Sequence, residues 1–307
     1  MTIASAAGHL RSLTLADGSA NILPETSVSS DRVYFLDGDR QLKWLKPDGS
    51  MGTAGEVPGS GSEESAFAVA PDNSRIAVAD FKLGAQRSFT YALTVAGLDG
   101  SGRKVVVQSS GSAQTSAIEW PVAWRGTSLL LQRGLLYNQY PYGYSSMAGF
   151  RLLDSDTGNQ QATICGNNQQ VWSPPVAAGV VCNATFNFAV QSLDGKTTFS
   201  STQCAPWSPS LAPDGSRWAG RPSAGSGGSC SNTSDPIALY APDRTVRSTG
   251  ITGSPWGWID AQHLVVNHES EVEAVSTPFR LVNVADNSVI ETHLTGRFVA
   301  VLPAAIT

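Results

Sequence analysis

The segment that decides the fold is LTVAGLDGSGRKVVV, residues 93–107. Two apolar runs in this segment flank the tight turn Leu98-Asp99-Gly100. Hairpin turns that follow the twist of paired strands need positive φ angles, which glycine tolerates and asparagine or aspartate can adopt. The segment therefore predicts a β-hairpin of two short strands.

The same strand-turn-strand pattern recurs along the chain. The other Asp-centred turns are Ala16-Asp17-Gly18, Pro47-Asp48-Gly49, Asp156-Thr157-Gly158, Leu193-Asp194-Gly195, Pro242-Asp243-Arg244 and Ala285-Asp286-Asn287. The aspartates are spaced by about 45 residues on average, which is the period of four-stranded propeller blades. Seven turns at this period predict an all-β fold, a seven-bladed β-propeller of four-stranded antiparallel blades that forms one domain over residues 1–307.

A second type of turn gives a family resemblance. Residues 70–78, APDNSRIAV, and residues 212–219, APDGSRWA, are near copies, and residues 29–33 and 125–129 are degenerate versions of them. This Pro-Asp turn followed by a strand resembles the repeat of TolB-type propellers, which is WD-like. The resemblance implies the propeller architecture and no particular activity.

The ends of the chain complete each other in this interpretation. The final strand, residues 297–302, has no Asp turn after it, and the first strands, residues 9–15 and 21–23, have no inner partner before them. Pairing of the C-terminal strand with the N-terminal strands would close the ring and remove exposed sheet edges.

Composition excludes several classes of protein. Hydrophobic residues make up 41% of the chain and charged residues 15%, while 30 Gly and 17 Pro are typical of many short strands joined by turns. The net charge of -5 gives no electrostatic reason to expect a nucleic acid partner. No apolar run approaches the roughly 20 residues of a membrane-spanning helix, and residues 1–5 lack the features of a signal peptide.

Four cysteines fall in one stretch of the second half: Cys165, Cys182, Cys204 and Cys230. We expect two structural disulfides, with free thiols as the alternative, because no closely spaced ligand pair predicts a zinc site. Sequential pairing, Cys165 with Cys182 and Cys204 with Cys230, is preferred over the two other connectivities. Disulfides imply an extracytoplasmic location, whether secreted, periplasmic or at the cell surface.

Several predicted loops are enlarged and rich in aromatic residues. They include residues 136–144, residues 222–232 and residues 267–273, together with connections between blades that carry tryptophans. Tyrosine and tryptophan offer rigid surfaces with a polar group, suited to sugars, peptides or proteins, although tryptophans also pack between blades. The predicted binding residues are Tyr137, Tyr140, Tyr142, Tyr144, Trp172, Trp207 and Trp256.

No sequence motif indicates catalysis. The histidines never form close ligand pairs, and His268 with Glu269, Glu271 and Glu273 is the one cluster suited to acid-base work or to a cation. Residues 154–159 begin like a calcium loop, but the later bidentate glutamate is missing. Neither G-x-S-x-G nor a phosphate-binding glycine loop occurs. We therefore predict no catalytic residue, no metal and no cofactor.

Three functions fit these features. The first is an extracytoplasmic ligand- or protein-binding propeller, a sensor, receptor or adhesion module that uses an aromatic loop face. The second is a propeller enzyme acting on glycans or peptides, because each blade of such an enzyme gives one residue and short motifs are not expected. The third is a structural subunit of a surface assembly, which would expose apolar patches at subunit contacts.

Overall fold

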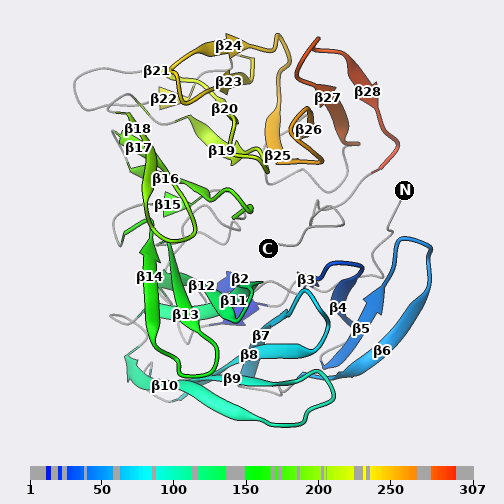
Figure 1. Cartoon of the computed structure of the whole chain (residues 1–307), viewed down its shortest axis with the longest axis vertical. Coiled ribbons are helices and arrows are strands. Elements are labelled where there is room, and N and C mark those ends of the chain that lie inside the picture. The colour runs from blue at the N-terminus through cyan, green and yellow to red at the C-terminus, as the bar shows by residue number, and fades with distance from the viewer. Residues whose placement is uncertain are drawn as a thin grey trace. The chain divides into compact units, whose positions relative to one another are not determined.

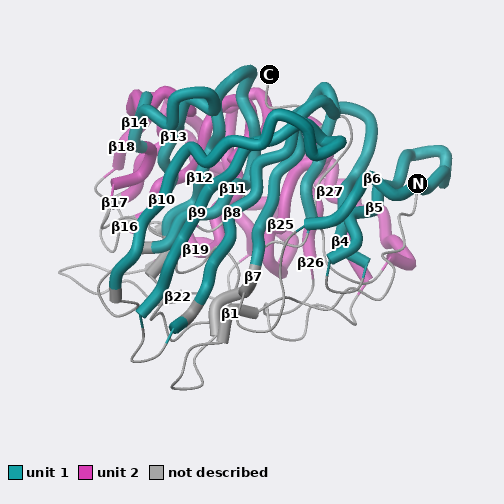
Figure 2. The backbone as a smooth tube through the Cα atoms, turned by 90° about the horizontal axis from the view of Figure 1, so that it is seen from below, with its two compact units in different colours: residues 1–141, 150–163, 302–307 teal, residues 142–149, 164–301 magenta. Residues whose placement is uncertain are grey.

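The computed structural model describes most of the chain and consists of strands joined by turns. The described residues are 12–14, 20–22, 26–37, 40–57, 63–84, 88–112, 117–135, 149–166, 170–171, 175–184, 187–201, 204, 206–224, 231–232, 236–267 and 278–294. Among them, no helix has the length and apolarity to cross a membrane. The chain divides into two compact units, coloured teal and magenta in Figure 2. Unit 1 comprises residues 1–141, 150–163 and 302–307, and unit 2 comprises residues 142–149 and 164–301.

Unit 1 contains three four-stranded antiparallel sheets, apart from the last residue of β14 (Figure 1). Sheet 1 is β3 (Thr26–Val28), β4 (Val33–Asp37), β5 (Gln41–Leu45) and β6 (Met51–Glu56). Sheet 2 is β7 (Glu63–Val69), β8 (Arg75–Leu83), β9 (Ser88–Gly97) and β10 (Lys104–Ser112). Sheet 3 is β11 (Ala117–Arg125), β12 (Ser128–Leu135), β13 (Phe150–Asp154) and β14 (Gln160–Ile164). The first strands of the three sheets contact one another, with β7 between β3 and β11.

Unit 2 contains three sheets of the same kind. Sheet 4 is β15 (Gln170–Val171), β16 (Val180–Ala184), β17 (Asn187–Gln191) and β18 (Thr197–Ser201). Sheet 5 is β19 (Trp207–Leu211), β20 (Trp218–Arg221), β23 (Ala238–Tyr240) and β24 (Val246–Ser248). Sheet 6 is β25 (Ser254–Trp258), β26 (His263–Asn267), β27 (Arg280–Asn283) and β28 (Val289–Glu291). Between β20 and β23 the chain forms a further hairpin of β21 (Ser223–Ala224) and β22 (Ser231–Asn232).

These six sheets are propeller blades, as the repeat predicts. A two-stranded sheet of β1 (Ser12–Thr14) and β2 (Ala20–Ile22) precedes them. The C-terminal strand expected at residues 297–302 lies outside the described residues. The seventh blade, its closure by the two ends of the chain and the single domain over residues 1–307 therefore stay predictions.

Aspartate side chains build the predicted turns by the same local chemistry. Asp99 Oδ1 accepts hydrogen bonds from the backbone N–H of Ser101 at 2.9 Å and from its hydroxyl at 2.6 Å, and Gly100 between them has a φ of 84°. A side-chain bond two residues ahead satisfies a backbone donor that the ladder leaves free. Five turns repeat the backbone bond: Asp48 to Ser50, Asp72 to Ser74, Asp214 to Ser216, Asp243 to Thr245 and Asp286 to Ser288.

One predicted turn has a different centre. At the end of β13 the accepting carboxylate belongs to Asp154 and not to Asp156, because Asp154 Oδ1 lies 2.7 Å from the N–H of Thr157 and 2.8 Å from its hydroxyl. The turn is one residue longer and the residue with positive φ is Gly158, at 74°. The predicted hairpin is confirmed, with its capping residue two positions earlier.

The strands of every sheet are connected at two opposite ends, and the connections at the two ends differ. We call the end where the first strand turns into the second and the third into the fourth the turn edge. The opposite edge, where second strands connect to third strands and each sheet connects to the next, is the loop edge. At the turn edge neighbouring sheets within a unit touch: the Ser30 N–H donates to Pro71 O at 3.1 Å, and the ammonium of Lys104 donates to Asp156 O.

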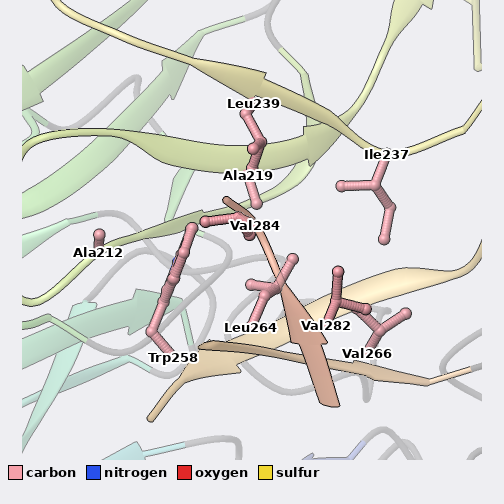
Figure 3. Close-up of a cluster of buried hydrophobic side chains, with 9 residues drawn as sticks. All are labelled: Ala212, Ala219, Ile237, Leu239, Trp258, Leu264, Val266, Val282 and Val284. Atoms are coloured by element: carbon pink, nitrogen blue, oxygen red, sulfur yellow. The ribbon is translucent and has the colours of Figure 1, made fainter. Parts of the chain in front are cut away.

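Buried tryptophans connect neighbouring sheets inside each unit. In unit 1, Trp124 Nε1 of β11 donates to Ala68 O of β7 at 3.0 Å, and in unit 2, Trp258 Nε1 of β25 donates to Ser210 O of β19 at 3.0 Å. Trp258 belongs to a cluster of nine buried side chains from sheets 5 and 6 and their adjoining turns (Figure 3). Each bond thus anchors the first strand of one blade to the first strand of the blade before it.

Candidate functional site

A half-buried ion-pair cluster lies in unit 1 near the loop edge of sheet 3. Glu119 of β11 stands opposite Arg133 of β12 in the strand register, and Arg151 is the second residue of β13. Glu119 Oε1 lies 3.2 Å from Arg133 Nε, and Arg151 Nη2 donates to Glu119 Oε2. Only 12% of the Glu119 side chain is exposed, compared with 26% for Arg133 and 24% for Arg151. One carboxylate therefore joins two guanidinium groups that come from consecutive strands.

The charges of this cluster act on the hydroxyl of Tyr91, a residue of sheet 2. Tyr91 belongs to β9 and is only 4% exposed. Burial raises the pKa of this phenol strongly, and the negative charge of Glu119 raises it further. Among the described residues the Tyr91 hydroxyl has no hydrogen-bond partner. A buried hydroxyl without a partner is uncommon in native proteins, so this position is suited to a water molecule or a ligand atom.

Burial also governs the ionisation of Glu119. Removal of the carboxylate from water raises its pKa, and the positive charges of Arg151 and Arg133 offset only part of that rise. With both arginines charged, the cluster of three side chains carries a net positive charge whenever Glu119 is ionised. The two arginines hold the Glu119 carboxylate in a fixed position. Within the described part of the chain, no three His, Cys, Asp or Glu residues lie together as a metal site would need.

The cluster is close in sequence to the segment that the sequence analysis predicts as the best binding candidate. Arg133 is two residues before the end of β12, and Arg151 follows the first residue of β13. The residues that join these two strands include Tyr137, Tyr140, Tyr142 and Tyr144, which lie outside the described residues, as does Trp172. Their role in binding stays a prediction.

The other two predicted tryptophans lie within strands and not in the connections between blades. Trp207 is the first residue of β19, and Trp256 is the middle residue of β25, where the register with β26 shifts. Both are half-buried, and the ring of Trp256 lies 5.9 Å from that of Phe279 in a tilted arrangement. The prediction that they lie in connections between blades is therefore wrong. Each lies next to a proline, and prolines also occur at bulges and at the first residues of strands.

The predicted disulfide between Cys165 and Cys182 is confirmed. Cys165 directly follows β14, Cys182 lies in β16, and their Cα atoms are 5.1 Å apart. Among the described residues no cysteine is free, and Cys204 in the connection before β19 is disulfide-bonded as well. Cys230, its predicted partner, lies outside the described residues, so the second pairing stays a prediction.

The charged residues of the cluster were missed by the sequence analysis. Glu119, Arg133 and Arg151 lie within otherwise apolar or alternating strands. Taken one at a time, each has the pattern of an ordinary strand residue. A usable signal is present in the triplets Phe150-Arg151-Leu152 and Phe279-Arg280-Leu281, which precede Asp-rich turns at similar distances. Repetition of an arginine at one place in two blades marks a position with a shared environment.

The chain is similar in structure to several solved proteins. A chain in the structure titled "Crystal Structure of Mitotic Checkpoint Complex" matches with a TM-score of 0.52 and 10% identity, over 88% of this chain and 76% of that one. BamB from Moraxella catarrhalis matches at 0.46 and 12%, over 89% and 74%, and the Neurospora crassa Pan2 WD40 domain at 0.44 and 6%, over 87% and 77%.

No protein-family profile and no curated protein matches the sequence. The described sheets are all four-stranded or two-stranded and antiparallel, with the short turns that the repeat predicts. The first of these structural matches agrees with this arrangement over most of the chain. The chain is therefore a β-propeller-repeat protein.

Proposed function

We propose that this chain is an extracytoplasmic ligand- or protein-binding propeller, a sensor, receptor or adhesion module that binds at its loop edge. The proposed partner is a protein, a peptide or a carbohydrate. The confirmed disulfide is the observation that carries the location, because disulfides form and persist in oxidising compartments. Residues 165 and 182 belong to a connection between sheets and to a second strand, so this bridge also stiffens a segment of the loop edge of sheet 4.

The unequal edges of the sheets support the proposed binding face. At the turn edge, connections such as those at Asp99 and Asp243 are closed tightly by a side chain. At the loop edge, the connections at residues 136–148 and 268–277 are much longer. Binding residues gather on loops that a rigid scaffold presents. The tyrosine-rich connection of sheet 3 is the proposed contact surface. Within unit 2, Trp172, Trp207 and Trp256 are proposed as binding residues in their own right.

A binding screen tests this proposal. The wild-type chain, the double variant Tyr140→Ala/Tyr142→Ala and the control Lys196→Ala are applied to glycan and peptide arrays at low salt. Lys196 lies at the turn edge of sheet 4 and is 81% exposed, so its loss leaves the loop edge intact. Selective binding by the wild type and the control that the double variant loses supports the proposal. Equal binding by all three proteins contradicts it.

Exposed apolar side chains favour a second candidate, a subunit of a surface assembly. They lie on the outermost strands of four sheets: Met51 at 65% exposure, Val105 at 52%, Val246 at 58% and Ile290 at 61%. Outermost strands present unpaired backbone groups that another chain can extend. Sedimentation velocity over a range of concentrations tests this candidate. Assembly that disappears when these four residues are replaced by serine supports it, and a monomer at every concentration contradicts it.

A further inference from the structure

Sheets 3 and 6 are built alike in their first three strands. Trp124 pairs opposite Leu129 in sheet 3, and Trp258 pairs opposite Leu264 in sheet 6. In both sheets the register between first and second strands shifts directly after a proline, Pro121 or Pro255. Both tryptophans donate to a carbonyl of the preceding sheet. Residues of the two sheets can therefore be compared position by position.

The comparison makes Arg280 the counterpart of Arg151. Arg151 pairs opposite Leu131, and Arg280 pairs opposite Val266, at the same place in the two registers. Each arginine directly follows a phenylalanine: Phe150 is the first residue of β13, and Phe279 immediately precedes β27. The two guanidinium groups thus occupy equivalent sites in different blades.

Their counter-charges differ. Glu119 stands five residues before Trp124, and the residue five before Trp258 is Gly253. A Cβ at Gly253 would lie 2.3 Å from the carbonyl oxygen of Asn267 and 3.1 Å from Arg280 Nη2, and the φ of Gly253 is 132°. No side chain can grow at this position without displacing the backbone. Sheet 6 therefore cannot supply from its first strand the carboxylate that sheet 3 supplies.

Arg280 is consequently a buried guanidinium with incomplete compensation. The residue is 8% exposed, and Nη2 donates to Thr252 O. Among the described residues, Arg280 Nε has no hydrogen-bond partner, and the guanidinium group makes no ion pair with any of them. Glu291 is its cross-strand neighbour and favours its charge, whereas burial lowers the pKa of the guanidinium overall. A buried charge without a partner is costly, and a planar guanidinium binds a carboxylate through two parallel hydrogen bonds.

We propose that sheet 6 holds a carboxylate-binding site, in which a ligand carboxylate pairs with Arg280 as Glu119 pairs with Arg151. The ligand carries a free carboxylate, as a small organic acid or a glutamate side chain of a peptide does. The site deepens the proposed binding function by naming a ligand chemistry, and it depends on none of the loop aromatics. A failed array screen and a failed test of Arg280 are therefore distinguishable.

Thermal unfolding in acetate tests the site. Sodium acetate is compared with sodium chloride at equal ionic strength and pH 7, with the melting temperature as the readout. Acetate at ten times its Kd raises the melting temperature of the wild type by about 2 °C, and above the Kd the increase grows with the logarithm of the acetate concentration. Arg280→Met loses the response, whereas Arg151→Met keeps it because Arg280 is unchanged. Arg280→Lys, which retains the charge, weakens acetate binding by about tenfold and serves if Arg280→Met does not fold.

Glu119→Ala is the positive control, because it removes the carboxylate from an equivalent arginine. This variant gains a second acetate response in sheet 3. If Glu119→Ala responds while the wild type does not, Arg280 is no carboxylate site and the proposal is overturned. The same holds if the response appears only in Glu269→Gln/Glu271→Gln/Glu273→Gln, since the chain itself would then fill the site.

Two further probes identify the source of the carboxylate. Glutarate represents small organic acids, and the capped peptide acetyl-Gly-Glu-Gly-amide represents acidic peptides. Each is titrated against wild type and Arg280→Met by calorimetry. Tighter binding of either probe than of acetate, lost in Arg280→Met, supports the site and assigns the source. Binding that Arg280→Met retains overturns the proposal.

Discussion

Replacement of Trp258 with phenylalanine tests whether the tryptophan bonds hold neighbouring blades together. The substitution keeps an aromatic ring in the cluster of Figure 3 and removes the indole N–H that donates to Ser210 O at 3.0 Å. Both groups are buried, so the carbonyl loses this donor in a region that excludes water. The change therefore separates a hydrogen bond between sheets from the general burial of an aromatic side chain.

Two contributions set the size of the effect. A buried carbonyl left without its donor costs about 1–3 kcal/mol. The smaller phenylalanine ring gives up buried area and leaves a small cavity, which costs about 1–2 kcal/mol. We expect Trp258→Phe to lower the free energy of unfolding by roughly 2–5 kcal/mol, and Trp124→Phe to do the same in unit 1.

Trp218→Phe is the matched control. Trp218 is 1% exposed and packs against Tyr240 with ring centroids 6.0 Å apart, but among the described residues its Nε1 has no hydrogen-bond partner. Only the cavity contribution of about 1–2 kcal/mol applies there. Urea denaturation followed by circular dichroism gives the midpoint and slope for each variant. If Trp258→Phe and Trp124→Phe cost no more than Trp218→Phe, the bonds do not stabilise the contact between sheets.

Other features of the fold give three more expectations. Replacing Cys165 and Cys182 by alanine opens a bridge between residues 17 positions apart and should cost about 3 kcal/mol, measured by urea denaturation under oxidising conditions; a double variant as stable as the oxidised wild type would contradict this. The Ser101 hydroxyl and N–H lower the pKa of Asp99, so its stabilising effect is present above the unfolded pKa near 3.9 and is lost as pH falls through the lower folded pKa. Asp99→Asn should therefore lose less melting temperature than the wild type between pH 5 and pH 2, whereas parallel pH profiles would refute the assignment. Gly158→Ala would place a Cβ 2.3 Å from Val106 O, while a Cβ at Gly100 meets nothing within 4 Å. In urea denaturation, Gly158→Ala should therefore lower the free energy of unfolding by about 1–3 kcal/mol more than Gly100→Ala does. Equal losses would refute the steric argument.

The sequence was sufficient to predict the fold wherever local chemistry decides the structure. An aspartate, a residue able to take positive φ and a serine or threonine form a turn through contacts within three residues, and Asp48, Asp99 and Asp286 do so. The role of Asp154 was not predicted, because this turn has an aspartate at two candidate positions, 154 and 156. Only the hydrogen bonds of the structure show which of the two caps the turn. Blade count depends on pairing between distant ends of the chain, which no local pattern specifies.

The candidate site was harder to predict, because its residues meet through register and not through spacing. Glu119 and Arg151 are 32 positions apart and become neighbours only when β11, β12 and β13 pair in one particular alignment. A shift of one residue would turn either side chain to the other face. The disulfide was easier, since Cys165 and Cys182 close a short segment and few cysteines compete for them.

The unlike edges of the sheets make this chain a scaffold for displaying foreign segments. Turns closed by an aspartate have no spare length, and they contact the neighbouring sheet at positions such as Ser30 and Lys104. Connections at the opposite edge carry no such constraint on length, since loop closure costs little for each added residue. A guest peptide inserted between β12 and β13 would leave all the turns unchanged, and a tether attached near Asp99, at the turn edge within the same unit, would leave the guest facing away from the support.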